Sequence, residues 1–450
     1  MRTMLVVPRS LPRALVLLAA VAVGCTDPHP TEPDGGPPTF GKISTTGPTV
    51  TATNPSFGKQ GTVNLDVQVI GSGFDQGSQA AWDSGGAPYP KITVNSTKFV
   101  SSTQLTANIT IGAAATVQYY DVAVTTSTGR KGVGTELFTV TLATSIAGAT
   151  DAVAVNDAGR VTGLDASGIY VFDVPTRSLQ DIGFTGTPWA LDQLGTTVSG
   201  QNSAGKPAVW TLAAGVWSEH VLPDSGAGGA ARGLASDPAT GAATFLTGSV
   251  QNSANTRHTP AKWTWNGTSW VLTGLPRPGP KGNGFGQDIN ASGMAVGMDG
   301  VTCCSAFFWN AAGTLTVLPQ LVSGAPSAAW AINDAGTIIV GNSNSVAVAW
   351  IRASTTDAWT TPVALENTAS FCTGRSAASV AHDVNSAGII VGASCGVPVA
   401  WKPAGGGYTR ELLGDLGNHR GGSANAINNG TVAPLIAAGT VGQGVFWTGF

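Results

Sequence analysis

Charged side chains are scarce in this 450-residue chain. Lys and Arg number 22 and Asp and Glu 25, so charged residues make up 10% of the chain and the formal net charge is −3. Proteins that bind nucleic acids neutralise phosphates with clustered Lys and Arg, and no long basic run follows the N-terminal segment. This composition therefore argues against nucleic-acid binding.

The residues that build long amphipathic helices are also scarce, whereas Gly alone occurs 61 times. Many short runs rich in Val, Thr, Ser and Ala lie between turn-forming residues, a composition typical of strands joined by tight turns. The sequence therefore predicts an all-β chain, and its length allows two or three domains.

The common catalytic and metal-binding motifs are missing. The chain has no Gly-x-Ser-x-Gly elbow, His-Glu-x-x-His helix, phosphate-binding loop, dinucleotide fingerprint or Cys-x-x-Cys pair. We therefore predict neither a cofactor nor a metal site, and no enzyme activity.

The N-terminal segment has the pattern of an export signal. Basic residues precede an apolar run from Ala14 to Val23, which is too short for a permanent membrane span. The segment Ala22-Val23-Gly24-Cys25 resembles a bacterial lipobox, although Leu is usual where Ala22 stands. The resemblance implies a signal peptide over 1–24, lipidation of Cys25 and an exported lipoprotein of the cell envelope, outer membrane or cell surface. The alternative is ordinary signal cleavage nearby, with Cys25 incidental.

Residues 25–47 are rich in Pro, Gly, Thr and Asp, which predicts a flexible tether. Residues 48–141 then alternate apolar and polar side chains in strand-length runs, such as Asn64 to Ile70 and Thr103 to Ile109, which favours a β-sandwich. The turn Gly71-Ser72-Gly73-Phe74, the strand start Ser102-Thr103-Gln104-Leu105 and the strand at Tyr120-Asp121-Val122 resemble an IPT/TIG domain. That family has an Ig-like fold and implies no particular ligand.

A pattern of about 44 residues recurs seven times over 142–450. Its clearest copy runs from Ala328 to Trp350 and contains a small-residue strand, the turn Asn333-Asp334-Ala335-Gly336, a second strand reaching Gly341 and a third strand ending at Trp350. In each turn Asn and Asp favour a type I turn and Gly takes a positive φ, so we interpret the motif as a hairpin device. The aromatic residues that end the third strand are Phe172, Trp210, Trp263, Trp309, Trp350, Trp401 and Trp447.

Four strands in about 44 residues is the period of a propeller blade, so we predict a seven-bladed β-propeller. The last copy ends after its third strand, at Phe450. We predict that 141–146 supplies the missing strand and closes the ring, which would remove its exposed edges. The repeats resemble HAF repeats, a mainly extracellular family without a shared chemistry.

One position of the inner strand varies in type from copy to copy, unlike its neighbours. It holds Val153, Trp189, Arg232, Gln287, Trp330, His382 and Asn425. We predict that the last six form an aromatic and polar pocket near the channel mouth, suited to sugars or peptides. The alternative is packing between blades.

Two further groups are candidates for chemistry. Asp288 and Asp383 occupy inner-strand positions where other copies have Ala or Gly, and paired carboxylates serve glycoside hydrolysis or cation binding; solvation of the channel is the alternative. Cys372 and Cys395 lie in connections that open on one face of a propeller, so we predict a disulfide between them. Cys303 and Cys304 are candidates for a disulfide between adjacent residues.

Together these patterns predict a non-enzymatic, lipid-anchored surface protein whose propeller binds a protein partner or a glycan. Two alternatives remain: a propeller enzyme acting on polysaccharide, with Arg232, Asp288, His382 and Asp383 as its candidate residues, and a purely structural envelope component.

Overall fold

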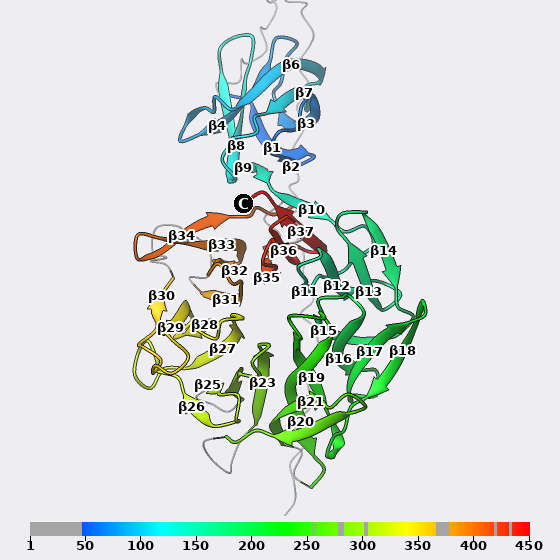
Figure 1. Cartoon of the computed structure of the whole chain (residues 1–450). Helices are drawn as coiled ribbons and strands as arrows, with labels where there is room; N and C mark the ends of the chain where they lie inside the picture. The colour runs from blue at the N-terminus through cyan, green and yellow to red at the C-terminus, as the bar shows by residue number, and fades with distance from the viewer. Residues whose placement is uncertain are drawn as a thin grey trace, which may run out of the picture. The chain divides into compact units, whose positions relative to one another are not determined.

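The computed structural model describes residues 47–254, 257–277, 283–300, 305–365, 378–417, 421–431 and 434–450. All regular structure in these residues is β, arranged in nine sheets (Figure 1). The prediction of an all-β chain is therefore confirmed. No helix capable of crossing a membrane occurs in the described ranges. The predicted signal peptide, Cys25 and almost all of the predicted tether lie outside them.

The first part of the described chain forms two sheets around one apolar core. Val67, Leu105 and Ile109 from one sheet and Trp82, Val122 and Phe138 from the other are buried together, with the rings of Trp82 and Phe138 packed edge to face at 5.6 Å. The alternating burial of β7 shows the period of two expected of a strand with one face on a core. The two sheets consist, in spatial order, of β1 (Thr49–Asn54), β3 (Leu65–Ser72), β7 (Gln104–Ile111) and β6 (Ile92–Ser101), and of β2 (Phe57–Lys59), β9 (Lys131–Thr141), β8 (Tyr119–Thr125), β4 (Gln79–Ser84) and β5 (Ala87–Pro88).

The repeats form seven four-stranded antiparallel sheets. In six of them the strands follow chain order from the inner to the outer edge. The first three are β11 (Ala154–Val155), β12 (Arg160–Leu164), β13 (Ile169–Asp173) and β14 (Ser178–Asp181); β15 (Gly186–Leu191), β16 (Thr197–Asn202), β17 (Pro207–Ala213) and β18 (Val216–Val221); and β19 (Gly226–Ser236), β20 (Ala243–Asn252), β21 (His258–Trp265) and β22 (Trp270–Gly274). The next three are β23 (Gly284–Ile289), β24 (Ala295–Asp299), β25 (Ala306–Trp309) and β26 (Leu315–Val317); β27 (Ser327–Ile332), β28 (Ile338–Ser343), β29 (Val346–Ile351) and β30 (Val363–Ala364); and β31 (Ser379–Val384), β32 (Ile390–Ser394), β33 (Val397–Ala404) and β34 (Gly407–Leu412).

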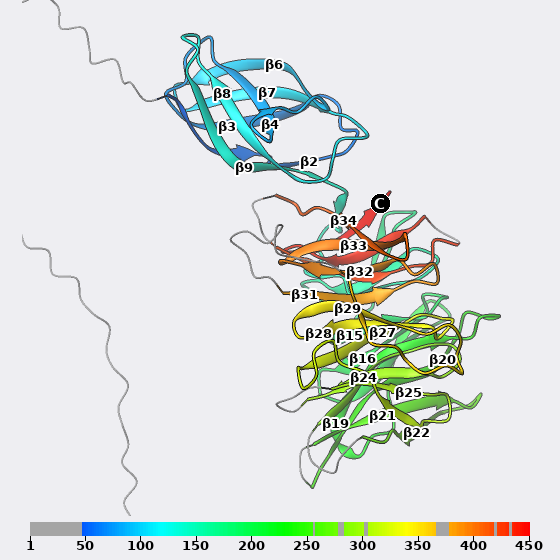
Figure 2. The same cartoon turned by 90° about the vertical axis from the view of Figure 1, so that its left-hand side faces the viewer.

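The seventh sheet closes the array. It contains β35 (Ser423–Ile427), β36 (Ile436–Thr440), β37 (Gly444–Thr448) and, as its outer strand, β10 (Ala143–Ser145) from the other end of the repeat region. Ala143 pairs with Trp447 and Ser145 with Val445, which confirms the predicted closing strand. Because β11 of the first sheet also contacts β35 and β36, the sheets follow one another in a closed, propeller-like ring (Figures 1 and 2).

A bulge and a glycine act together in the repeats. In the fifth sheet Ala329 and Ala331 pair with consecutive residues of β28, so Trp330 between them is an extra, unpaired residue. The partner of Ala329 is Gly341, and a Cβ at Gly341 would overlap the carbonyl oxygen of Ala328. The same bulge recurs in five other sheets, opposite a glycine with the same close approach. This explains the glycine of the second strand in these six sheets.

The tryptophans of the third strands link neighbouring parts of the ring. The indole N–H of Trp350 donates to the carbonyl oxygen of Pro319 at 2.7 Å, in the connection that leads into the sheet. Trp263, Trp309 and Trp447 make the equivalent bond to the carbonyls of Pro223, Pro276 and Gly414. All seven third-strand aromatic residues are buried. These four indoles therefore fill a core and also satisfy a carbonyl of the incoming connection.

Trp350→Phe and Trp401→Phe form a matched pair that tests this link. Both side chains are fully buried, but the Trp401 indole N–H has no hydrogen-bond partner among the described residues. The two substitutions remove the same atoms, and only Trp350→Phe also removes the donor of the partly buried Pro319 carbonyl. We expect Trp350→Phe to lower the free energy of unfolding by about 1 to 2 kcal/mol more than Trp401→Phe, measured by urea denaturation. Equal losses would show that the indole bond contributes nothing.

Candidate functional site

The turn asparagines hold neighbouring sheets together at one end of the channel. The Oδ1 of Asn290 accepts the backbone N–H of Met294 within its own turn, while its Nδ2 donates to the carbonyl of Asn333 in the next sheet at 3.2 Å. Asn156 and Asn385 make the same pair of bonds, to Asp192 and Asn428 of the following sheets. The motif that we interpreted as a hairpin device is therefore also a link between sheets.

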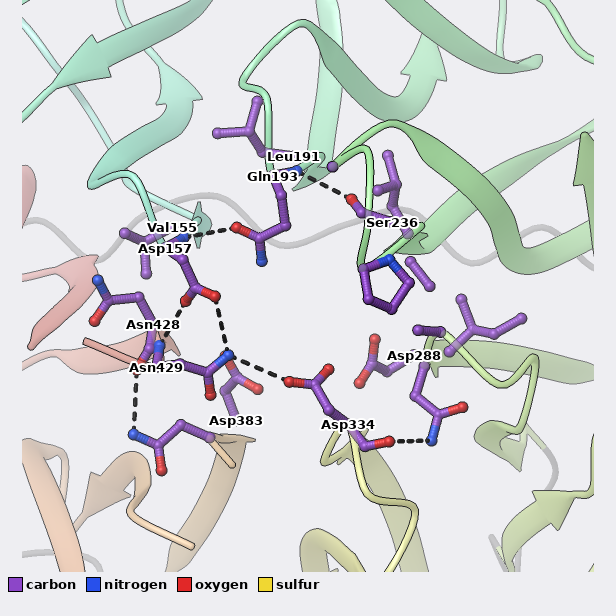
Figure 3. Close-up of a pocket in the computed structure, with 18 of the residues that line it drawn as sticks. Val155, Asp157, Leu191, Gln193, Ser236, Asp288, Asp334, Asp383, Asn428 and Asn429 are labelled. Atoms are coloured by element: carbon purple, nitrogen blue, oxygen red, sulfur yellow. Dashed lines mark hydrogen bonds between the residues drawn. The ribbon is translucent and has the colours of Figure 1, made fainter. Parts of the chain in front are cut away.

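The turns held in this way surround a cavity of about 710 Å³ (Figure 3). All seven sheets contribute to its wall, through the ends of the inner strands and the turns that follow them. Five aspartates line it, and no Lys, Arg, His, Phe, Tyr or Trp is among the described residues of its wall. The five are Asp157, Asp237, Asp288, Asp334 and Asp383.

Asn429 bridges two of these carboxylates. Its Nδ2 donates to Asp157 at 3.1 Å and to Asp334 at 3.2 Å, which lie on the first and fifth sheets (Figure 3). Asp157 also accepts the backbone N–H of Asn429, and Asp334 accepts the hydroxyl of Ser386 at 2.8 Å. These contacts bring turns of non-neighbouring sheets into one hydrogen-bonded network of carboxylates and neutral donors.

Asp288 and Asp383 link sheets from inner-strand positions. Asp288 accepts the backbone N–H of Ile332 at 3.0 Å, and Asp383 that of Ile427 at 2.8 Å, each in the following sheet. Burial raises the pKa of Asp288 to about 7, with a further contribution from the charge of Asp334. Burial and then the charge of Asp288 raise the pKa of Asp383 to about 8. Near neutral pH these two carboxyl groups are therefore partly protonated.

The six residues predicted to form a pocket share one structural position. Each is the bulge residue of its inner strand, and none is part of the cavity wall. They are Trp189, Arg232, Gln287, Trp330, His382 and Asn425.

These bulge residues meet in neighbouring pairs. The guanidinium of Arg232 lies 5.1 Å from the ring of Trp189 and donates to Gln287 at 3.3 Å. The rings of Trp330 and His382 lie 6.0 Å apart, and burial lowers the pKa of His382 to about 4, so this imidazole is neutral at pH 7. The structure thus brings the residues together between successive sheets.

The contacts of the remaining bulge residues are structural. Asn425 donates to the carbonyl of Ala152 at 2.9 Å, which joins the last sheet to the first, and Trp330 donates to the side chain of Asn342 in its own sheet. Ligand binding by the six residues stays a prediction. Sequence reasoning missed Asp157, Asp334 and Asn429; their signal is the second turn position, whose identity varies while the preceding Asn recurs.

Cys395 is disulfide-bonded, and its partner lies outside the described residues. Cys303, Cys304 and Cys372 also lie outside them, so the pairing of Cys372 with Cys395 and the bond between Cys303 and Cys304 stay predictions. Within the described ranges, no group of three or more His, Cys, Asp or Glu side chains is arranged to hold a metal ion.

Comparison with known proteins shows no established family. No protein-family model matches the chain, and no curated protein is similar to it in sequence. Similar solved structures include a chain of the mitotic checkpoint complex, with a TM-score of 0.45 and 10% identity over 68% of this chain and 91% of that one. Another is Sqt1 of Saccharomyces cerevisiae, with a TM-score of 0.37 and 12% identity over 67% and 96%. At these levels no functional inference follows, and the fold description rests on the strand pairing.

The raised pKa values of Asp288 and Asp383 predict that stability falls as pH rises. Because both groups hold protons more tightly in the folded than in the unfolded chain, their contribution is fully present below about pH 4 and is lost as pH rises through 7 to 8. The double variant Asp288→Asn/Asp383→Asn should flatten this dependence, by on the order of 1 kcal/mol per carboxyl group given the access of solvent from the cavity. Urea denaturation midpoints between pH 5 and 9 measure the effect.

Asp237→Asn is the control, because this carboxylate lines the same cavity but hydrogen bonds from Thr240 and Ala239 lower its pKa. Its variant should keep the wild-type pH dependence. A double variant whose denaturation midpoint still declines as steeply as that of the wild type would contradict the assignment.

Proposed function

We propose that the chain is a non-enzymatic binding protein of the cell envelope that recognises a protein partner at the turn end of its channel. In this proposal a lipid at Cys25 anchors the protein, an IPT/TIG-like, Ig-like sandwich over 48–141 acts as a spacer, and a seven-bladed propeller of HAF-type repeats over 142–450 presents the site. Seven four-stranded sheets and a preceding two-sheet segment support this organisation.

The acidic cavity is the observation that carries the proposal. Five carboxyl groups surround it and no cationic side chain of the described wall offsets them, so a complementary ligand brings positive charge or hydrogen-bond donors. A Lys or Arg side chain meets this requirement, because its long apolar stem reaches into a channel while its head pairs with carboxylates.

A protein partner fits this cavity better than a glycan does. Sugar sites commonly offer an aromatic face for stacking, and none of the described wall residues is aromatic. The glycan alternative rests on Trp189 and Trp330, which lie at the bulges rather than in the cavity wall. The enzyme alternative rests on Asp288 and Asp383, but each holds a backbone N–H of the next sheet, which supports a linking role.

Peptide binding by the wild type and by Asp157→Asn/Asp334→Asn tests the proposal. The probes are three fluorescent capped peptides of equal length, whose binding is measured by anisotropy. The central residues are Arg and Lys in the basic peptide, Gln in the neutral peptide and Glu in the acidic peptide. We expect the basic peptide alone to bind, with an affinity that decreases as salt increases. The double variant keeps acceptors for Asn429 while removing two charges, and it should bind about ten-fold more weakly.

Glu411→Gln removes one charge from a residue outside the cavity wall, where it pairs with Lys402, and should leave peptide binding unchanged. The proposal would be contradicted if the acidic peptide bound as tightly as the basic one, or if Asp157→Asn/Asp334→Asn bound the basic peptide as tightly as the wild type. Hydrolysis of a polysaccharide that depends on Asp288 or Asp383 would favour the enzyme alternative instead.

A further inference from the structure

Arg232 carries a charge that the described protein does not neutralise. No carboxylate of the described residues lies within ion-pair distance of its guanidinium. Burial disfavours the charged form and lowers the pKa of Arg232, although arginine still remains protonated at neutral pH. A half-buried cation without a counter-charge is unusual, because buried charges in proteins are normally paired.

Two hydrogen-bond donors beside this charge are also unused. The Nε of Arg232 and the Nε2 of Gln287 are both buried and have no hydrogen-bond partner among the residues that the structure describes. Gln287 is only 9% exposed, and its Oε1 already accepts a bond from Arg232 Nη1 at 3.3 Å. A buried donor without an acceptor costs about 1 to 3 kcal/mol, so two such donors beside one cation point to a missing acceptor that carries negative charge.

The surroundings restrict the shape of that acceptor. The Arg232 guanidinium lies 5.1 Å from the ring of Trp189 in the preceding sheet and 5.1 Å from the ring of Phe285 in the following sheet. Aromatic rings from both neighbouring sheets thus already pack against the guanidinium. Its Nε–H still lacks an acceptor among the described residues. A carboxylate has two oxygens in one plane and matches a guanidinium N–H together with an adjacent amide N–H.

The other titratable groups nearby do not supply this acceptor. His258 packs on Phe285 with a centroid distance of 5.0 Å, and burial followed by the charge of Arg232 lowers its pKa, so it is mostly neutral at pH 7. Asp288 follows Gln287 in β23, but its carboxyl group is bound to Ile332 of the next sheet. The described residues therefore supply no negative charge to Arg232.

We propose that Arg232 and Gln287 form a site for the carboxylate of a small organic acid, with Trp189 and Phe285 holding the guanidinium in place. Arg232 Nε and Gln287 Nε2 donate to the ligand, and because both atoms are buried in the structure, the two side chains move apart to admit it. The acid is either free or part of an acidic sugar, and both sources present the same group. This site lies at the bulges of β19 and β23, apart from the acidic cavity, and does not rest on the function proposed above.

Calorimetric titration of the purified protein at constant ionic strength tests this site. The probes are acetate, D-glucuronate, D-glucose as the neutral counterpart of glucuronate, and sulfate. We expect acetate and glucuronate to bind and glucose not to bind. Equal affinity for the two acids assigns the site to free carboxylates, whereas an affinity for glucuronate about ten-fold higher assigns it to an acidic sugar. Equal binding of sulfate, or no binding of either acid, would overturn the proposal.

Two substitutions separate the site from general anion binding. Gln287→Glu places a carboxylate beside Arg232 within the chain, so it should abolish acid binding and raise the thermal midpoint. Arg232→Gln removes the positive charge and should abolish acid binding without raising the thermal midpoint. His382→Gln alters the equivalent bulge position of another sheet and should bind both acids normally. Acid binding that persists in Arg232→Gln, or a Gln287→Glu variant that still binds, would refute the assignment.

Discussion

The ring depends on polar bonds that cross from one sheet to the next. Apolar contacts between sheets are strong but tolerate small rotations, because they have no preferred direction. The bonds from the turn asparagines and from the third-strand indoles are directional, and they act in different parts of each sheet. Together they restrict both the spacing and the rotation between neighbours, and β10 completes the seventh sheet as its outer strand.

The chemistry of the channel follows from this constraint. Asn156, Asn290 and Asn385 each bind the turn of the following sheet, which brings turns together around one end of the channel. Asp157, Asp334 and Asn429 occupy the second position of their turns, where the turn accepts several residue types. The bulge of the inner strand also provides a variable position, because its extra residue has no partner in the strand register. Both candidate sites therefore use positions that the architecture leaves open.

Much of this fold could be predicted from the sequence because its signals are local. The spacing of turn glycines and third-strand aromatics placed the strands, and the missing fourth strand of the last copy predicted the closing role of β10. The inter-sheet role of Asn156, Asn290 and Asn385 could not be predicted in this way, because it depends on how one sheet is rotated against the next. A sign of it was present: Asn recurs at a turn position where Asp or Ser would serve a hairpin equally well.

The acidity of the cavity raises the question of whether it reflects a ligand or only the architecture. Asp237 closes its own turn, and Asp288 and Asp383 hold the next sheet, so three of the five carboxyl groups have structural partners that account for them. Asp157 and Asp334 differ, because their shared partner is the amide of Asn429, a bond that Asn or Ser could make without charge. Two carboxylates thus stand where neutral residues would suffice, and the charge of Asp334 adds to the burial that raises the pKa values of Asp288 and Asp383. That electrostatic cost is what a cationic partner would offset.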